Sequence, residues 1–177
     1  MGEPLEYARG LIREIPDYPL PGIRFQDVTP LLANGPAFAS VVHALKPMAD
    51  TCDAIAGIEA RGFIFASALA QSLGLGFIPI RKAGKLPFQT FEEGYSLEYG
   101  SDVLQIHQDA LNVGTRVLLL DDVLATGGTA VAASKLVTRL GATIHGFAFV
   151  IEIAELPGRS TLNEAFPNLP LIALFTI

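Results

Sequence analysis

The chain has almost none of the residues that hold disulfide-rich or metal-bound folds together. It contains one cysteine, Cys52, no tryptophan and only three histidines among 177 residues. A lone cysteine cannot form an internal disulfide, and one cysteine with three scattered histidines makes no recognisable zinc-binding set. We therefore expect a fold that is held by its own hydrophobic core, without disulfides or structural zinc.

Positive charge and long apolar runs are also scarce. The 12 Lys and Arg residues stand against 18 Asp and Glu, which gives a formal net charge of −6. Such a chain has no overall electrostatic attraction to nucleic acid or to anionic lipid, so we expect neither as a partner. No apolar run is long enough to span a bilayer, and the charged residues near the start leave no signal-peptide core. These absences predict a cytoplasmic protein without a membrane segment.

Apolar residues are abundant instead, and they make up 50% of the sequence against 17% charged residues. A chain of this length can form one domain that buries roughly 70% of its extended-chain surface. We expect a single domain over residues 1–177. The apolar content also favours self-association, because some apolar surface is left to be covered.

Short apolar runs alternate with stretches of helical spacing along the chain. The runs typical of buried strands are residues 54–58, 76–80, 117–120, 144–153 and 169–177, and residues 103–106 fit an antiparallel or edge strand. Helical spacing is found in residues 5–15, 36–45, 63–73 and 130–140, whereas the polar stretch after residue 156 looks like a connection. The alternation predicts an α/β fold with a mainly parallel central sheet flanked by helices.

The chain is organised around the strand at residues 117–120 and the polar loop after it. Two carboxylates, Asp121 and Asp122, come where the strand is expected to leave the sheet, which is the edge where open α/β sheets bind ligands. The next residues form a glycine- and hydroxyl-rich loop: Ala125, Thr126, Gly127, Gly128 and Thr129. Such a loop at a helix start offers backbone N–H groups and a partial positive charge to a phosphate. Carboxylates suit a ribose diol and can engage Mg²⁺ through water. A phosphorylated ribose satisfies both demands.

Two further polar loops come after strands. Arg61 and Gly62 come after the run at 54–58, and three cations in five positions, Arg81, Lys82 and Lys85, come after the run at 76–80. An arginine at a strand end is by itself more often a surface ion pair, and a basic run is usually a solvated face. Because these loops are expected at the same sheet edge as the phosphate loop, we interpret them as anion-binding.

These motifs resemble the type I phosphoribosyltransferases, and further stretches resemble the adenine-specific members of that family. The further matching stretches are residues 16–22, 25–30, 61–63, 81–87 and 95–100. The resemblance implies the type I fold, with a small N-terminal hood over about residues 1–33 and a flexible flap over about residues 83–100. It also implies a homodimer.

The implied reaction transfers 5-phosphoribose from 5-phosphoribosyl 1-diphosphate to N9 of adenine. The products are AMP and diphosphate, and the process is purine salvage. Mg²⁺ is the implied cofactor, held mainly through the substrate diphosphate and the ribose hydroxyls, so no side chain is assigned as a metal ligand.

The resemblance assigns a role to each matched residue. The catalytic residues are Glu98, as proton acceptor, and Arg61. Diphosphate contacts fall to Glu59, Ala60, Arg61, Arg81, Lys82 and Lys85. Ribose contacts fall to Asp121 and Asp122, and 5′-phosphate contacts fall to Ala125, Thr126, Gly127, Gly128 and Thr129. Adenine contacts fall to Arg24, Phe25 and Val123.

Two positions depart from the family pattern. Gln26 replaces the usual Arg or Lys, and Ala60 removes a hydroxyl. The rival functions are transfer to hypoxanthine, guanine or xanthine, and a non-catalytic regulatory protein that keeps the donor site. The residues around Phe25 and Glu98 argue against the first, and the acidic chain without an added basic domain argues against the second.

Overall fold

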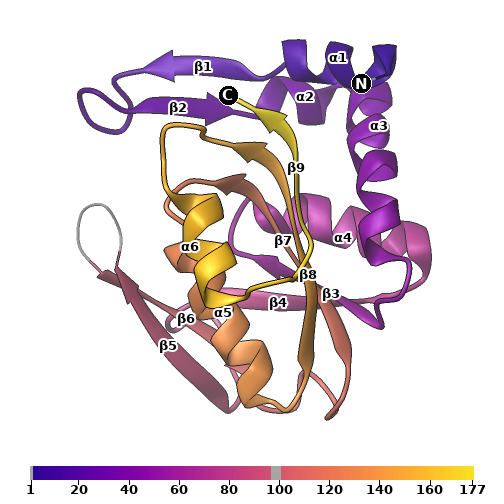
Figure 1. Ribbon diagram of the computed structural model, residues 1–177, viewed down its shortest axis with the longest axis vertical. Helices are drawn as coiled ribbons and strands as arrows, with labels where there is room; N and C mark the ends of the chain where they lie inside the picture. The colour runs from indigo at the N-terminus through magenta and orange to yellow at the C-terminus, as the bar shows by residue number, and fades with distance from the viewer. Residues whose placement is uncertain (1, 97–100) are drawn as a thin grey trace. The chain divides into compact units, whose positions relative to one another are not determined.

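The computed structural model describes residues 2–96 and 101–177 (Figure 1). The chain divides into two compact units, Met1–Ala44 and Leu45–Ile177. The part of the expected flap at residues 97–100 lies outside the described residues. Among the residues that are described, no helix has the length and apolar character needed to cross a bilayer.

The N-terminal unit combines helices with a two-stranded sheet. Its elements are α1 (Glu3–Gly10), β1 (Arg13–Pro16), β2 (Arg24–Asp27), α2 (Thr29–Ala33) and α3 (Gly35–Leu45). Strands β1 and β2 pair antiparallel. The start of α3 is capped by Asn34, whose side-chain oxygen accepts a hydrogen bond from the backbone N–H of Ala37 at 3.0 Å. This confirms the helix that the sequence predicts there.

The helix expected over residues 5–15 is wrong in its second half. Helix α1 ends at Gly10, and Arg13–Pro16 is strand β1 instead. In the strand, Ile15 lies opposite Phe25 and Arg13 lies opposite Asp27, whose carboxylate accepts bonds from the Arg13 guanidinium at 2.6 and 3.1 Å. These cross-strand pairs form only across the hairpin, and they override a weak helical spacing. The short helix α2 is also absent from the expected elements.

A seven-stranded sheet forms the centre of the C-terminal unit. Its strands are β3 (Ala54–Ile58), β4 (Gly76–Lys82), β5 (Thr90–Ser96), β6 (Ser101–His107), β7 (Arg116–Leu124), β8 (Thr143–Glu152) and β9 (Leu171–Thr176). The spatial order is β5-β6-β4-β3-β7-β8-β9. Five strands, β4, β3, β7, β8 and β9, run parallel, while β5 and β6 form an antiparallel extension. The predicted mainly parallel sheet is confirmed.

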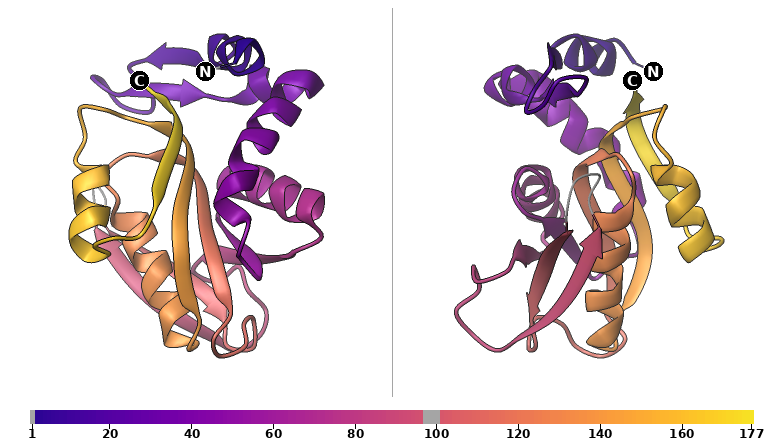
Figure 2. Two further views of the ribbon diagram at one scale, coloured as in Figure 1. Left: turned by 45° about the vertical axis from the view of Figure 1, so that its right-hand side comes forward. Right: turned by 90° about the vertical axis from the view of Figure 1, so that its left-hand side faces the viewer.

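The helices of this unit are α4 (Gly62–Leu73), α5 (Gly128–Arg139) and α6 (Gly158–Ala165), and the 3₁₀ helix η1 covers Lys46–Ala49. The β3-α4-β4 crossover moves one way along the sheet and β7-α5-β8 moves the other way. Right-handed crossovers in opposite directions place α4 and α5 on opposite faces, an arrangement that can be followed in Figures 1 and 2. The strand order therefore reverses between β3 and β7, where such sheets bind ligands.

Two expectations about this unit need correction. Strand β7 continues to Leu124, so Asp121 and Asp122 lie within the strand and Asp121 pairs with Phe149 of β8. Parallel pairing satisfies the backbone of these residues, so the strand does not end where its apolar run ends. The connection after residue 156 contains helix α6, of which only Gly158 and Leu162 are buried. A single buried leucine gives too weak a periodic signal for a helix.

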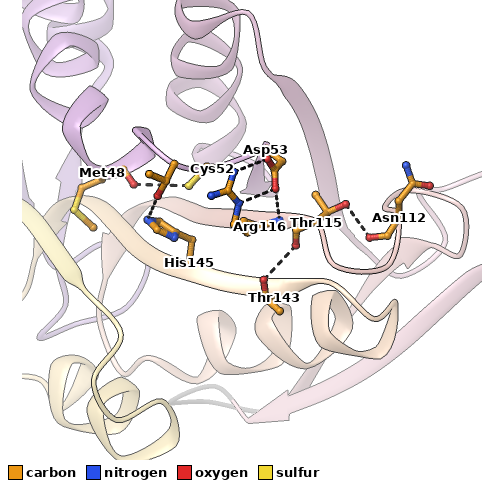
Figure 3. Close-up of polar contacts among 9 residues, drawn as sticks. Met48, Cys52, Asp53, Asn112, Thr115, Arg116, Thr143 and His145 are labelled. Atoms are coloured by element: carbon orange, nitrogen blue, oxygen red, sulfur yellow. Dashed lines mark hydrogen bonds and ion pairs between the residues drawn. The ribbon is translucent and has the colours of Figure 1, made fainter.

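Polar side chains tie the strands together at the amino edge of the sheet (Figure 3). Asp53 accepts hydrogen bonds from the backbone N–H of Arg116 at 2.8 Å and from its guanidinium at 2.8 and 3.0 Å. These bonds lower the pKa of Asp53 to about 2. Nearby, the Thr51 hydroxyl and His145 Nε2 are 3.1 Å apart, and burial raises the pKa of the Cys52 thiol to about 11. This edge binds the starts of β3, β7 and β8 to one another.

Candidate active site

The opposite, carboxyl edge of the sheet brings three predicted polar loops to the point where the strand order reverses. Residues 59–61 connect β3 to α4, and Arg81 and Lys82 end β4. The acidic pair and the phosphate loop lie at the end of β7 and the start of α5. Because β3 is hydrogen-bonded to both β4 and β7, all three loops leave neighbouring strands. The chain positions the predicted diphosphate, ribose and 5′-phosphate residues side by side.

Arg61 and Asp122 form the ion pair at the centre of this edge. Arg61 Nε lies 2.6 Å from Asp122 Oδ2, and only 7% of the Asp122 side chain is exposed. Burial raises the pKa of Asp122 above its usual range, although the charge of Arg61 opposes that rise. Burial and the negative charge of Asp122 raise the pKa of Asp121 well above its usual range. Asp122 is thus buried next to a partly exposed like charge, and one guanidinium is its ion-pair partner.

Gly62 lets the start of α4 approach this acidic pair. A Cβ atom at Gly62 would stand 2.6 Å from Asp121 Oδ1 and 3.2 Å from the backbone oxygen of Leu120. Asp121 Oδ1 also accepts a hydrogen bond of 2.8 Å from the backbone N–H of Asp122. Any larger residue at position 62 would therefore displace α4 or the Asp121 carboxylate.

The predicted phosphate loop leads directly into α5. Gly127 takes a left-handed backbone conformation, with a φ of 85°, and caps the helix that begins at Gly128. Its carbonyl accepts a bond from the N–H of Val131 at 3.0 Å. The first N–H groups of a helix have no partner within the helix, so Gly128 and Thr129 present donors at the end of the sheet. Ala125 and Thr126 form the turn between β7 and this helix end.

Gly158, at the start of α6, supports the phosphate loop from outside. A Cβ atom there would lie 2.3 Å from the backbone oxygen of Ala125 and 2.7 Å from a methyl group of Leu124. The sequence places Gly158 only in a polar connection, and its spacing gives no sign of this contact. The one available signal is the Pro157-Gly158 turn that opens the polar stretch.

Glu59 holds the basic loop of residues 81–85 by direct hydrogen bonds. Its carboxylate accepts bonds from the Arg81 guanidinium at 2.9 and 3.2 Å and from the backbone N–H of Lys82 at 2.9 Å. The Arg81 bonds hold the pKa of Glu59 below its usual range. Arg81 also donates to the backbone oxygen of Lys85 at 3.0 Å, and the Glu59–Ala60 peptide bond is cis. The loop thus enters the site with its arginine already oriented.

Lys82 pairs with a residue that the sequence does not single out. Its Nζ atom lies 3.0 Å from Asp102 Oδ2, a contact that raises the pKa of Lys82 and lowers that of Asp102. Asp102 lies opposite Tyr95 in the β5–β6 pairing, and their side-chain oxygens are 3.5 Å apart. Only the register of two strands brings these residues together.

The predicted adenine-binding residues lie in both units. In the N-terminal unit, Arg24 is mostly exposed at the start of β2, and its guanidinium is 3.8 Å from Glu14. Phe25 packs edge-on against Tyr18, with ring centroids 5.2 Å apart. Val123 is partly exposed in β7 of the C-terminal unit. Glu98, the predicted proton acceptor, lies outside the described residues.

The acidic pair is the part of the carboxyl edge that suits a metal ion. Within residues 2–96 and 101–177, no three His, Cys, Asp or Glu side chains are arranged to hold a metal ion by themselves. Asp121 and Asp122 do supply oxygen donors of the kind that Mg²⁺ prefers. With one arginine beside them, these two carboxylates fit an ion held mainly by a phosphorylated substrate.

A doubly wound sheet with a predicted phosphate loop and an acidic pair at its reversal point is typical of α/β proteins that bind phosphorylated ligands, and the family comparison identifies which family this is. Residues 28–161 match the model of the phosphoribosyl transferase domain. The fold and the motifs together place the chain among the phosphoribosyltransferases.

Individual relatives narrow this class. The adenine phosphoribosyltransferase of Roseiflexus sp. (strain RS-1) is 54% identical over 156 residues, which are 87% of this chain and 91% of that protein. The solved adenine phosphoribosyltransferase of Rhodothermus marinus is 44% identical with a TM-score of 0.91, covering 98% of both chains. The Saccharomyces cerevisiae enzyme, solved with an imino-altritol bisphosphate and adenine, is 38% identical with a TM-score of 0.90 over 98% of this chain and 99% of that one. The chain belongs to the adenine phosphoribosyltransferase family, as the resemblance in its motifs predicts.

Proposed function

We infer that the protein is an adenine phosphoribosyltransferase, which transfers a 5-phosphoribosyl group to N9 of adenine and forms AMP and diphosphate. The observation that carries this conclusion is the agreement between full-length relatives of that name and the three polar loops at the sheet reversal. We further propose 5-phosphoribosyl 1-diphosphate as the donor, purine salvage as the role, a homodimer as the assembly and the cytoplasm as the location.

In the proposed donor site, each part of the donor is assigned to one of the neighbouring loops. The 5′-phosphate accepts bonds from the loop at residues 125–129, and the ribose hydroxyls donate to Asp121 and Asp122. The diphosphate meets Arg61, Arg81, Lys82 and Lys85, and the backbone N–H of Ala60 contributes a further donor. Glu59 acts through Arg81, which it orients, because its own N–H donates to the backbone oxygen of Ile80 at 2.9 Å. These assignments are supported by the chemistry of each group, because guanidinium and ammonium groups stabilise charge on a leaving diphosphate.

The reaction exchanges two bonds at the anomeric carbon of the ribose. The bond from this carbon to a diphosphate oxygen breaks, the bond to adenine N9 forms, and the N9 proton passes to a base, which we propose is Glu98. Mg²⁺ would neutralise charge on the diphosphate when bound, and Asp121 and Asp122 would face it. Arg61 would orient the leaving group and shield the acidic pair.

Adenine is assigned as the purine substrate by resemblance and by hydrogen-bond chemistry. Adenine places an acceptor, N1, beside a donor, N6, so an extended backbone can pair with both, whereas hypoxanthine inverts both groups. Strand β2 is extended at Arg24 and Phe25, which supports a backbone contact there. We propose that Phe25 stacks on the purine and that Val123 contacts it.

The test is diphosphate release by the purified protein with Mg²⁺ and the donor, comparing adenine with hypoxanthine, guanine and xanthine at equal concentrations. We expect release with adenine and at most a small fraction of that rate with the oxopurines. Preference for an oxopurine would contradict the base assignment. Donor binding without turnover on any base would support the regulatory alternative instead.

A further inference from the structure

Strand β5, which enters the expected flap, is held on helix α5 by a row of side chains. Phe91 and Glu93 lie two residues apart in the strand and therefore point to the same face. Glu93 forms an ion pair of 2.8 Å with Lys135, and Arg139 lies over the Phe91 ring at 4.2 Å. Tyr95 is the next residue on this face, and its hydroxyl interacts with the side chain of Thr129 at the start of α5.

Tyr95 differs from Phe91 and Glu93 because its contacts reach the proposed substrate loops. On one side is Thr129, from the proposed 5′-phosphate loop. On the other side is Asp102, 3.5 Å from the Tyr95 hydroxyl, and beyond it Lys82, from the proposed diphosphate set, 3.0 Å from Asp102. A series of polar side chains thus runs from the proposed 5′-phosphate loop to the proposed diphosphate set.

The protonation states give this series a direction. Burial, together with the charge of Asp102, raises the pKa of Tyr95, so the phenol keeps its proton at neutral pH. The contact with Lys82 lowers the pKa of Asp102, so its carboxylate is ionised. The phenol therefore donates to Asp102 and its oxygen can accept from the Thr129 hydroxyl. Each member has one role, and removing the Tyr95 hydroxyl leaves both neighbours with one partner fewer.

We propose that Tyr95 is a positioning residue for the phosphoribosyl donor: its hydroxyl joins Thr129 to the Asp102–Lys82 pair and so fixes the 5′-phosphate and diphosphate loops relative to each other. This proposal rests on the proposed function, since it assigns the two loops to the two ends of one donor. It adds Tyr95 and Asp102, which touch neither end themselves, to the residues that determine donor binding.

The first test is Tyr95→Phe, which keeps the buried ring and removes only the hydroxyl. We expect kcat/KM for the donor to fall about three- to tenfold, the range for losing a hydrogen bond in a charged series, with KM for adenine unchanged. Asp102→Asn should cause a loss of at least that size. The double variant should lose no more than the larger single loss, because both changes interrupt the same series. Wild-type kinetics in Tyr95→Phe, or fully additive losses, would overturn the proposal.

Glu93→Gln with Lys135→Met is the matched control, because it removes a polar β5–α5 contact that does not reach the substrate loops. Both this pair and Tyr95→Phe should lower the melting temperature by about 2–4 °C, while only Tyr95→Phe changes kcat/KM. An equal kinetic loss in the control would mean that Tyr95 acts through strand packing alone, which also overturns the proposal.

Calorimetric titration with 5-phosphoribosyl 1-diphosphate and Mg²⁺, in the absence of adenine, separates this proposal from the proposed function. A wild-type protein that fails to turn over adenine would defeat the proposed function. Donor affinity would still decide the role of Tyr95: a three- to tenfold weakening in Tyr95→Phe supports it, whereas unchanged affinity, or no donor binding by the wild type, overturns it.

Discussion

Strand β7 has carboxylates in opposite environments near its two ends. At the amino edge, Asp53 accepts bonds from both the backbone and the guanidinium of Arg116, and its pKa falls to about 2. At the carboxyl edge, Asp121 and Asp122 lie next to each other beside one arginine, and burial raises the pKa of both. The same strand, β7, carries Arg116 at one end and the acidic pair at the other.

The difference separates stability from function. A carboxylate whose folded pKa lies below its unfolded pKa contributes stability at neutral pH, and this contribution is lost as the pH falls through the folded value. A carboxylate whose folded pKa is raised opposes folding at neutral pH, because its charge is held away from water. Asp53 at the amino edge therefore contributes to the stability of the sheet, whereas the acidic pair at the carboxyl edge keeps charges that a ligand can satisfy.

The largest effect is expected from Glu98, which lies outside the described residues. Glu98→Gln removes the proposed proton acceptor while it keeps the size of the side chain. We expect turnover to fall by about 10²- to 10⁴-fold, the usual contribution of a general base, with little change in donor affinity. Steady-state diphosphate release measures this, and full turnover in Glu98→Gln would contradict the assignment.

Arg61→Ala should have the next largest effect, because it removes the cation on which the carboxyl edge depends. Loss of one charge-stabilising donor costs about 3 to 4 kcal/mol in comparable sites, so we expect kcat/KM to fall by about 10²- to 10³-fold. Arg61→Lys is the control: it restores charge without the bidentate fork and should recover only part of the loss. Equal activity of the lysine variant and the wild type would show that the fork is not needed.

Asp121→Asn tests whether the ionised carboxylate at the carboxyl edge destabilises the fold. The amide oxygen can still accept the bond from the Asp122 N–H, but the carboxylate charge is gone. We expect a higher denaturant midpoint at pH 7, together with donor affinity about 10- to 100-fold weaker, because a charge-assisted bond to the ribose is lost. Chemical denaturation and calorimetry measure the two quantities. A lower midpoint would mean that the ionised carboxylate stabilises the fold.

Asp53→Asn is the partner experiment at the amino edge and should have the smallest effect on catalysis. We expect kcat/KM within about twofold of the wild type, since Asp53 lies at the far edge of the sheet, but a lower denaturant midpoint at pH 7. The folded pKa of about 2 places the loss of this contribution between roughly pH 4 and pH 2 as the pH falls. The midpoints of variant and wild type should therefore converge on acidification. A constant difference down to pH 2 would contradict this linkage.

The sequence predicts the carboxyl edge of the sheet better than it predicts the amino edge. The apolar run at 117–120 and the acidic pair after it are local patterns, so they predict the central strand and the site at its end. The Asp53–Arg116 contact joins residues 63 positions apart and leaves no local pattern. Tyr95, Asp102 and Gly158 escape prediction for the same reason, since strand register or loop packing alone gives them their roles. The error at β1 is similar, because Arg13 and Ile15 find their partners only across the hairpin.

A crystal structure of the complex with 5-phosphoribosyl 1-diphosphate and Mg²⁺ would test the central claim most directly. We predict that the 5′-phosphate lies at the loop of residues 125–129, with the ribose hydroxyls on Asp121 and Asp122 and the diphosphate beside Arg61, Arg81 and Lys82. A donor bound elsewhere, with the carboxyl edge unchanged, would contradict the account.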